Sequence, residues 1–329
     1  MRIVNFRTGR ELRLGLLMGN RILDPLTAER LEPKEAAWFS STVDFIEAGK
    51  PALTLATSLL DDGAGEWREV SEVTLAAPIR PTTMLCAGSN YRAHNQEKAN
   101  TPLSGVEPEF FVKTADCIIG PGESILHDSL LTTKLDCETE LAVVVGRSGR
   151  HIPIDKALEH VFGYTIVNDV TARDRQVRRS PGGTVWYDLG RGKAFDTSAP
   201  TGPVIVTADE IGDPQSLRLS TRINGELRQS SSTAEMIWSC AEIIHFFSIN
   251  FTLRPGMVII TGTPAGTAWS NDPELGGHWQ PAPGLVPATR YCLPGDVIEC
   301  EIEKIGILTN RIVEAPAFAT DVPAPAPHY

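Results

Sequence analysis

The chain has 329 residues, of which 42% are hydrophobic and 22% are charged, and its formal net charge at pH 7 is -11. This length is ample for a sizeable core, and the acidic balance, without basic runs that carry interleaved aromatic residues, argues against a nucleic-acid partner. No segment reaches the roughly 20 apolar residues of a membrane span, and residues 1–7 lack a signal core, so we expect a cytoplasmic protein without a membrane partner.

Residues 1–77 are predicted to form a small N-terminal α+β domain without catalytic residues. Alternating apolar residues at 12–17 and 21–24 flank a Gly-Asn pair, which indicates a β-hairpin. Apolar periodicity then predicts a helix over residues 42–60. Pro78 and Pro81 mark an extended junction, because each proline disfavours helix at the residue before it.

Residues 78–314 are predicted to form a second, mainly β domain, which makes the fold class α+β. Short β-branched segments alternate with glycine and proline turns at 202–207, 217–223, 257–261 and 296–302. One helix is expected to begin at Thr233 and to extend past Phe247. The Ala- and Pro-rich residues 315–329 should form a tail that packs loosely or crosses to a neighbouring subunit.

The first candidate site lies in residues 135–146, a valine-rich run that predicts a buried strand. Glu138 and Glu140 are two residues apart and should therefore project from the same face. Two buried anions are tolerable side by side only if one has a raised pKa or if a cation lies between them. A hard divalent ion such as Mg²⁺ is the usual solution, and the alternative is an exposed face of an edge strand.

A third carboxylate follows the apolar strand predicted over residues 163–168. Asp169 stands at the strand end, where active-site groups collect, and Thr171 with Asp174 is expected to cap a short helix after it. Three carboxylates suit Mg²⁺ or Mn²⁺, with Ca²⁺ as a further candidate. The alternative is that Asp169 serves only as a turn former.

A candidate acid–base pair is formed by His94 and Glu97. At a spacing of three residues they can meet on one helical turn, where the carboxylate would orient the imidazole and raise its basicity toward a bound water. The alternative, which the spacing alone favours, is an exposed ion pair.

Two further residues are candidates for substrate contact. Lysine is ordinarily a solvated surface charge, but Lys193 near a carboxylate-rich metal site can neutralise a substrate carboxylate or a developing enolate. Thr263 lies in the small-residue segment 261–266, where a ligand can approach the backbone and the hydroxyl group. The alternative for this segment is a plain exit from strand to turn, and the pattern of a phosphate loop is absent.

Five motifs, at residues 82–97, 135–146, 163–176, 191–203 and 260–266, occur in one order. Together they resemble the fumarylacetoacetate hydrolase family, in the branch similar to acylpyruvate hydrolases and oxaloacetate decarboxylases. The resemblance covers roughly residues 80–315 and implies a mixed β-roll and a homodimer. The spacing from Tyr91 to His94 matches the bacterial branch and departs from the name-giving animal enzyme, so fumarylacetoacetate itself is not implied as substrate.

The resemblance also assigns roles to the candidate residues. It implies metal binding by Glu138, Glu140 and Asp169. It implies catalysis by His94, Glu97 and Lys193. It implies substrate binding by Tyr91, Arg173, Gln176 and Thr263.

The expected activity is metal-dependent hydrolysis of a C–C bond in an acylpyruvate-like 1,3-diketo acid, in the catabolism of aromatic or sugar acids. His94 would deprotonate a water that attacks the distal carbonyl, and cleavage would expel a pyruvate enolate stabilised by the metal and Lys193. Decarboxylation of an oxaloacetate-type 2-oxo diacid yields the same enolate and is the closest alternative. A third possibility is the isomerisation or hydration of unsaturated oxo acids. The alternative from a different class is a carboxylate-binding protein without catalytic activity.

Two insertions beside these motifs are expected to set substrate specificity. Residues 177–190 contain two arginines and two aromatic residues, and residues 268–291 contain Trp269, His278 and Trp279. Aromatic, glycine-rich loops are plausible lids, and the alternative is an exposed loop or a dimer contact. The six cysteines show no metal-type spacing and are expected to be reduced thiols, with Cys137 pointing away from the metal ligands.

Overall fold

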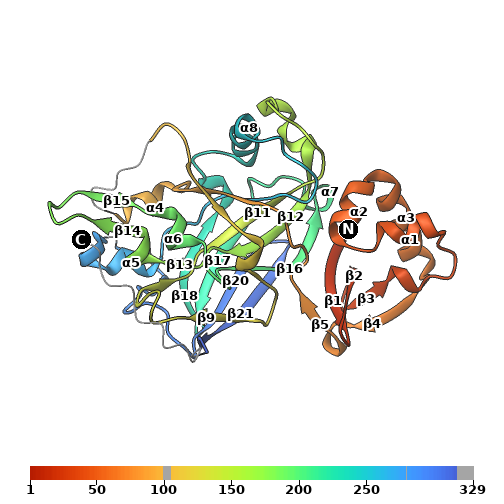
Figure 1. The fold of residues 1–329 in the computed structure, drawn as a ribbon, viewed down its shortest axis with the longest axis horizontal. Coiled ribbons are helices and arrows are strands. Elements are labelled where there is room, and N and C mark those ends of the chain that lie inside the picture. The colour runs from red at the N-terminus through yellow and green to blue at the C-terminus, as the bar shows by residue number, and fades with distance from the viewer. Residues whose placement is uncertain (99–104, 279, 317–329) are drawn as a thin grey trace, which may run out of the picture.

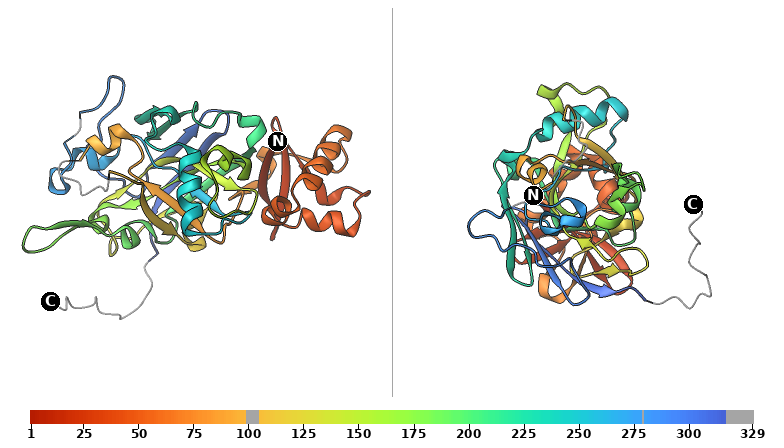
Figure 2. Two further views of the ribbon diagram at one scale, coloured as in Figure 1. Left: turned by 90° about the horizontal axis from the view of Figure 1, so that it is seen from above. Right: turned by 90° about the vertical axis from the view of Figure 1, so that its left-hand side faces the viewer.

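The computed structural model describes residues 1–98, 105–278 and 280–316. The molecule is elongated, with residues 1–76 at one end and the larger β-rich part at the other (Figures 1 and 2). Strands make up 37% of the chain and helices 26%, which confirms the predicted α+β, mainly β class. The predicted tail falls almost entirely on residues 317–329, which lie outside the described residues.

The N-terminal unit is a curled sheet covered by three helices. The predicted hairpin is confirmed, and the predicted helix over 42–60 is two helices, because Gly49 adopts a left-handed φ of 63° that ends the first one. Pro51 then occupies the first turn of the second helix, where its missing N–H costs nothing. The elements are β1 (Arg2–Thr8), β2 (Glu11–Met18), β3 (Arg21–Asp24), α1 (Pro33–Trp38), α2 (Thr42–Ala48), α3 (Lys50–Asp62), β4 (Glu66–Glu69) and β5 (Thr74–Ala76).

The central sheet continues from this unit into the larger part, because β1 pairs with β16 (Ala199–Thr207). From β16 the order continues through β12 (Val161–Asn168), β11 (Thr139–Val145), β19 (Val258–Ile260), β6 (Met84–Gly88) and β7 (Glu109–Lys113), while the short β8 (Ile118–Ile119) pairs with β16. Both faces of this sheet are buried. Along β11, Leu141 and Val143 enter one core cluster and Ala142 and Val144 enter the other.

A second sheet packs on one face of the first and shares its core cluster. Its order is β18 (Glu226–Ser232), β17 (Arg218–Ile223), β20 (Val297–Ile302), β21 (Gly306–Glu314) and β9 (Ser124–His127). The helices of this region are α7 (Ala208–Ile211) and α8 (Cys240–Asn250). The predicted helix start at Thr233 is wrong. Ser239 and Glu242 form a reciprocal capping box, which fixes the first helical residue at Cys240.

Short elements at the end of the molecule opposite the N-terminal unit build the candidate site (Figure 1). They are α4 (Arg92–Gln96), β10 (Leu135–Asp136), β13 (Thr171–Ala172), α5 (Arg173–Gln176), β14 (Val177–Arg179), β15 (Val185–Tyr187) and α6 (Leu189–Lys193). Insertion 177–190 therefore contains a β-hairpin. All six cysteines are buried and free. In the described part of the chain, no helix combines the length and apolar character that crossing a membrane requires.

Candidate metal and acid–base site

Three buried carboxylates gather where β11 begins and β12 ends. Glu140 lies opposite Val167 in the strand pairing, and the Asp169 N–H donates to the Glu138 carbonyl at 2.8 Å. One oxygen from each of Glu138, Glu140 and Asp169 lies within 4.8 Å of the others. The two glutamates lie together as predicted, although the predicted strand over 135–146 is interrupted at 137–138 and Glu138 comes just before β11. Cys137 points elsewhere, with its Sγ 3.8 Å from that of Cys292.

The spacing and charge of this cluster fit one divalent ion. Oxygens bound at about 2.0 to 2.6 Å on opposite sides of an ion are about 4 to 5 Å apart. Burial raises the pKa of Glu140 well above its ordinary value, and the charges of Asp169 and Glu138 add to the rise. Burial also acts to raise the pKa of Glu138, but Arg173 and Lys193 outweigh it and hold that pKa low. An added cation would stabilise Glu140 most.

Two lysines already neutralise part of the cluster. The Lys193 ammonium lies 2.6 Å from both Glu138 Oε2 and Asp169 Oδ2, and the Lys113 ammonium lies 2.9 Å from Asp169 Oδ1. Gly192 allows α6 to approach α5, because a Cβ there would lie 2.7 Å from the Gln176 Cα. Sequence reasoning missed Lys113. The sequence feature that could have indicated this residue is a lysine at an inward-facing position of β7, next to phenylalanine and valine.

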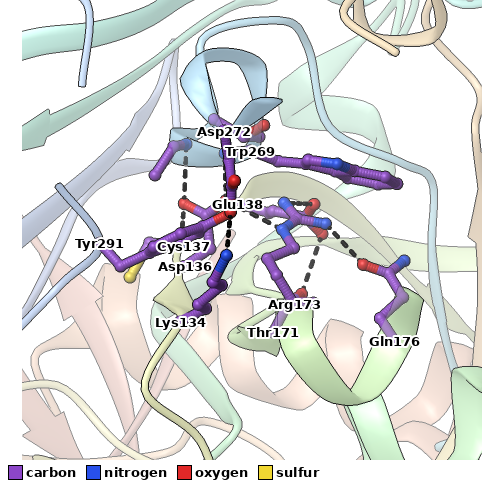
Figure 3. Close-up of polar contacts among 12 residues, drawn as sticks. Lys134, Asp136, Cys137, Glu138, Thr171, Arg173, Gln176, Trp269, Asp272 and Tyr291 are labelled. Carbon is purple, nitrogen blue, oxygen red and sulfur yellow. Dashed lines mark hydrogen bonds and ion pairs between the residues drawn. The ribbon is translucent and has the colours of Figure 1, made fainter. Parts of the chain in front are cut away.

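Arg173 is fully buried behind Glu138 (Figure 3). Its guanidinium donates to Glu138 Oε1, to Asp136 Oδ2 at 2.9 Å and to Gln176 Oε1 at 2.9 Å. Asp136 also accepts the backbone N–H of Trp269 at 3.2 Å. Arg173 therefore holds a proposed metal ligand in place and connects it to insertion 268–291. Asp136 was not a predicted site residue.

The predicted cap of the helix after Asp169 is wrong. Thr171 Oγ1 donates instead to the Asp169 carbonyl at 2.9 Å, and the Asp174 carboxylate accepts the backbone N–H of Thr133 at 3.2 Å. Ala172 occupies the N-cap position without a side-chain hydrogen bond. Both polar side chains therefore stabilise the loop around the carboxylates and do not cap the helix.

His94 and Glu97 form a buried pair at the end of α4. His94 Nδ1 lies 2.6 Å from Glu97 Oε2, and His94 Nε2 lies 4.0 Å from Glu138 Oε1. The exposed ion pair that the spacing alone favours is therefore not formed. The Glu97 carboxylate also accepts the backbone N–H of Gly266 and the Thr267 hydroxyl, so it is held from two sides.

Burial sets the protonation of this pair. It lowers the pKa of His94 well below its ordinary value, and Lys98 and Arg173 lower it further, while Glu138 opposes them. Burial raises the pKa of Glu97 to about 8, against the stabilising N–H of Gly266. The imidazole is therefore neutral at pH 7 and can accept a proton at Nε2, the nitrogen that faces the carboxylate cluster.

One pocket unites most of the predicted residues. It is lined by His94, Glu138, Glu140, Asp169, Gln176, Lys193 and Thr263. Glu97 and Arg173 lie directly behind this wall. Tyr91 does not line the pocket and lies in the hydrophobic core, where its hydroxyl has no hydrogen-bond partner among the described residues. The Thr263 hydroxyl donates to the Thr139 carbonyl at 3.1 Å and accepts from Gln229.

Both insertions reach this site. Tyr187 and Leu189 of insertion 177–190 line the pocket, and the Tyr187 ring lies 5.7 Å from the ring of Trp269 in insertion 268–291. The backbone N–H of His278 donates to the Glu97 carbonyl at 3.1 Å. Trp279 lies outside the described residues.

The pocket also contains Lys98, which the sequence motifs did not indicate.

Comparison with known proteins places this site in a family. Residues 83–313 match the model of the fumarylacetoacetate hydrolase C-terminal domain. The chain is 36% identical to the mitochondrial oxaloacetate tautomerase FAHD2B of Bos taurus over 318 residues, covering 95% of this chain and 92% of that protein. It is 40% identical to the oxaloacetate tautomerase YisK of Bacillus subtilis over 245 residues, which cover 74% of each.

A solved structure agrees with this assignment. The maleylpyruvate hydrolase of Sphingobium sp. SYK-6, determined with manganese(II) and pyruvate, superposes with a TM-score of 0.72 at 25% identity. The superposition covers 96% of this chain and 100% of that one. With a family model matching most of its length and relatives similar over nearly all of it, the chain belongs to the fumarylacetoacetate hydrolase family.

Proposed function

We propose that this enzyme transfers a proton at the carbon beside the keto group of a short 2-oxo diacid and so interconverts the keto and enol forms of oxaloacetate. The observation that carries the proposal is the buried His94 imidazole, whose Nε2 lies 4.0 Å from Glu138 Oε1 and faces the carboxylate cluster. The relatives named oxaloacetate tautomerases, at 36% and 40% identity, support this choice of substrate.

Glu138, Glu140 and Asp169 would hold one Mg²⁺ or Mn²⁺ ion, with Ca²⁺ as a further candidate. When bound, that ion would supply Lewis acidity toward the carboxylate and keto oxygens of the substrate. The manganese(II) reported with the maleylpyruvate hydrolase supports a divalent ion in this family.

The side chains of the pocket perform the proton transfer. His94 Nε2 takes a proton from C3 of the substrate, and the C–H electron pair becomes the C2–C3 double bond of an enolate. Glu97 Oε2 lies 2.6 Å from Nδ1, so ionisation of Glu97 would stabilise the resulting imidazolium. The Lys193 ammonium stabilises the negative oxygen. Return of the proton to that oxygen completes the enol.

Hydrolysis of an acylpyruvate, the activity expected from the sequence, is the second candidate. The same Nε2 would take a proton from water, the hydroxide would add to the distal carbonyl, and the C–C bond would break to give a carboxylic acid and the enolate of pyruvate. The structural similarity to a maleylpyruvate hydrolase supports this reaction. Decarboxylation of oxaloacetate forms the same enolate and releases carbon dioxide without a water nucleophile.

One experiment separates the three reactions. Purified enzyme with Mn²⁺ is given enol oxaloacetate, keto oxaloacetate and a series of acylpyruvates, and the ultraviolet absorbance of the enol, pyruvate and carbon dioxide are each followed. We expect rapid loss of enol absorbance before any pyruvate forms. Pyruvate release from acylpyruvates without enol turnover would reject the first proposal in favour of hydrolysis, and no turnover of any oxo acid would indicate a binding protein.

The assembly and the location of the enzyme remain proposals. We propose a homodimer, as expected from the family resemblance, and a cytoplasmic location, although the bovine relative is named as mitochondrial. Light scattering of the purified protein would give twice the chain mass of 35.7 kDa for the dimer. A tagged protein in cell fractionation would test the location.

A further inference from the structure

Lys98 is a buried cation in the pocket to which no role has yet been given. Its side chain is 8% exposed and lines the same pocket as His94, Glu140 and Lys193. It follows Glu97 directly in the chain, so it lies on the histidine side of the pocket. Lys193 occupies the carboxylate side. The pocket therefore contains two ammonium groups, one of them bound to the proposed metal ligands and the other outside them.

The position of Lys98 is fixed from both ends. Its backbone forms a bridge with Gly277, and its ammonium lies 4.6 Å from the centre of the Trp269 ring, within the range of a cation–π contact. Trp269 is itself held in place, because its backbone N–H donates to Asp136 and its indole N–H donates to the Leu275 carbonyl at 3.0 Å. The ammonium is thus positioned before a ligand arrives.

Lys98 differs from the other buried cations of the site in its charge partners. Lys113, Arg173 and Lys193 each contact a carboxylate. Within residues 1–98, 105–278 and 280–316, Lys98 forms no such ion pair, although Glu109 lines the same pocket. A buried cation is costly unless an anion compensates it, so this ammonium favours an anionic group entering the pocket.

The electrostatic surroundings agree with that preference. Burial and then the charge of Arg173 lower the pKa of Lys98 to about 7, although Glu97 and Glu138 act in the opposite direction. An arriving carboxylate within about 4 Å would favour the charged ammonium and would be bound by it. The aromatic face of Trp269 supports the ammonium without competing for its hydrogen-bond donors.

We propose that Lys98 binds the second carboxylate of a dicarboxylic 2-oxo acid and so selects diacids over 2-oxo acids with a neutral end. The inference rests on the proposed function and narrows its substrate class. If Lys193 and an ion at the carboxylate cluster hold the 2-oxo end of a four-carbon diacid, its far carboxylate would point to Lys98, which lines the same pocket. C3 then lies between the two ends, on the side of His94 Nε2.

The test compares binding of two ligands to Lys98→Met, Lys98→Gln and Lys98→Arg. Calorimetry with Mn²⁺ measures 3,3-difluoro-oxaloacetate, a diacid without hydrogen on C3 that cannot enolise, and pyruvate, which lacks the second carboxylate. We expect Lys98→Met and Lys98→Gln to weaken diacid binding by about 10- to 100-fold, the range for a hydrogen bond to a charged group, with pyruvate binding within about 2-fold. Lys98→Arg should retain most of the preference. Lys156→Met, at an exposed lysine paired with Glu159, is the matched control.

The outcomes decide between roles. Equal weakening of both ligands would show that Lys98 only supports the fold, and unchanged diacid binding would show that it does not contact the carboxylate; either result overturns the proposal. If Lys98→Met does not fold, as judged by circular dichroism, Lys98→Gln and Lys98→Arg decide. Failure of the proposed function is recognised separately, because wild-type enzyme would then bind the diacid through Lys98 but leave enol oxaloacetate unchanged.

Discussion

His94 Nε2 lies 4.0 Å from Glu138 Oε1, so His94 and the carboxylate cluster line the same pocket. A substrate whose oxygens are held at the cluster therefore presents its adjacent carbon to the imidazole. Because the two groups come from different elements, α4 and the start of β11, their contributions can be separated by mutation.

Replacing Glu140 with Gln should weaken metal binding and activity together. The amide keeps the size of the side chain and its hydrogen bond from the Gly262 N–H but removes the charge that an added cation would stabilise most. We expect Mn²⁺ affinity, measured by calorimetry, to fall roughly 100-fold or more, since even outer partners of metal ligands contribute 10- to 100-fold. Glu159→Gln, on the exposed surface, is the control, and unchanged Mn²⁺ affinity in Glu140→Gln would show that it is not a ligand.

Replacing His94 with Ala should abolish proton transfer but spare the metal. Loss of a general base costs roughly 100-fold or more in kcat/KM. Mn²⁺ affinity should stay near that of the wild type, because the three carboxylates remain. His160→Ala removes a half-buried histidine whose ring hydrogen-bonds the Arg147 carbonyl outside the site, and serves as the control. Full enol turnover by His94→Ala would assign the base elsewhere.

Arg173 should act through Glu138 rather than through the substrate. Arg173→Lys keeps the charge but cannot bind Asp136, Glu138 and Gln176 at once, so we expect weaker Mn²⁺ binding and lower kcat with little change in substrate KM. Arg173→Met leaves the buried Asp136 without its cationic partner and Glu138 with Lys193 alone, and should lower the free energy of unfolding by about 3 to 5 kcal/mol, measured with urea. A rise in KM alone would instead indicate direct contact with substrate.

Shortening the β14–β15 hairpin should change which substrates are preferred. Tyr187 and Leu189 line the pocket, whereas the proposed metal ligands lie on other elements. Joining residues 178 and 186 by a two-residue turn should therefore alter the ranking of 2-oxo acids in kcat/KM and leave Mn²⁺ affinity intact. An identical ranking across charged, aromatic and aliphatic substrates would give the hairpin a structural role.

Asp296 should make stability depend on pH. Burial acts to raise its pKa, but Arg290, Asn224 and the backbone N–H of Leu293 outweigh burial and hold the pKa at about 2, below the value of about 3.9 in an unfolded chain. The stabilisation is therefore complete above pH 4 and is lost as the pH falls toward 2. Since Arg290 is half exposed, we expect Asp296→Asn to cost about 1 to 2 kcal/mol at pH 7. Urea unfolding from pH 7 to pH 3 should show that difference shrinking, and a constant difference would contradict the assignment.

Local patterns in the sequence were sufficient for the parts of the site that lie on one element. The two-residue spacing correctly predicted that Glu138 and Glu140 lie together, and the three-residue spacing brought His94 to Glu97. The start of α8 also had a local signal in Ser239 and Glu242, which the apolar periodicity alone overlooked.

Contacts between distant segments could not be predicted in this way. Asp136 joins Arg173, 37 residues later, to the backbone of Trp269, 133 residues away, and no local pattern encodes that distance. Lys113 in β7 binds Asp169, which follows β12, and these two strands are not neighbours in the sheet. Such buried charges are recognised only once the partners that compensate them are known in space.

The Trp269 ring, which lies close to two cations, also gives the protein an optical signal of its own. The Lys98 ammonium lies 4.6 Å from the ring centre and the Arg173 guanidinium lies 5.1 Å from it. The wavelength of indole fluorescence depends on the electric field at the ring. An anion that binds in the pocket and attracts these cations would therefore shift the emission wavelength of this residue. Trp269 is one of six tryptophans, and its fluorescence can be used to follow ligand binding in the pocket over time without an added label.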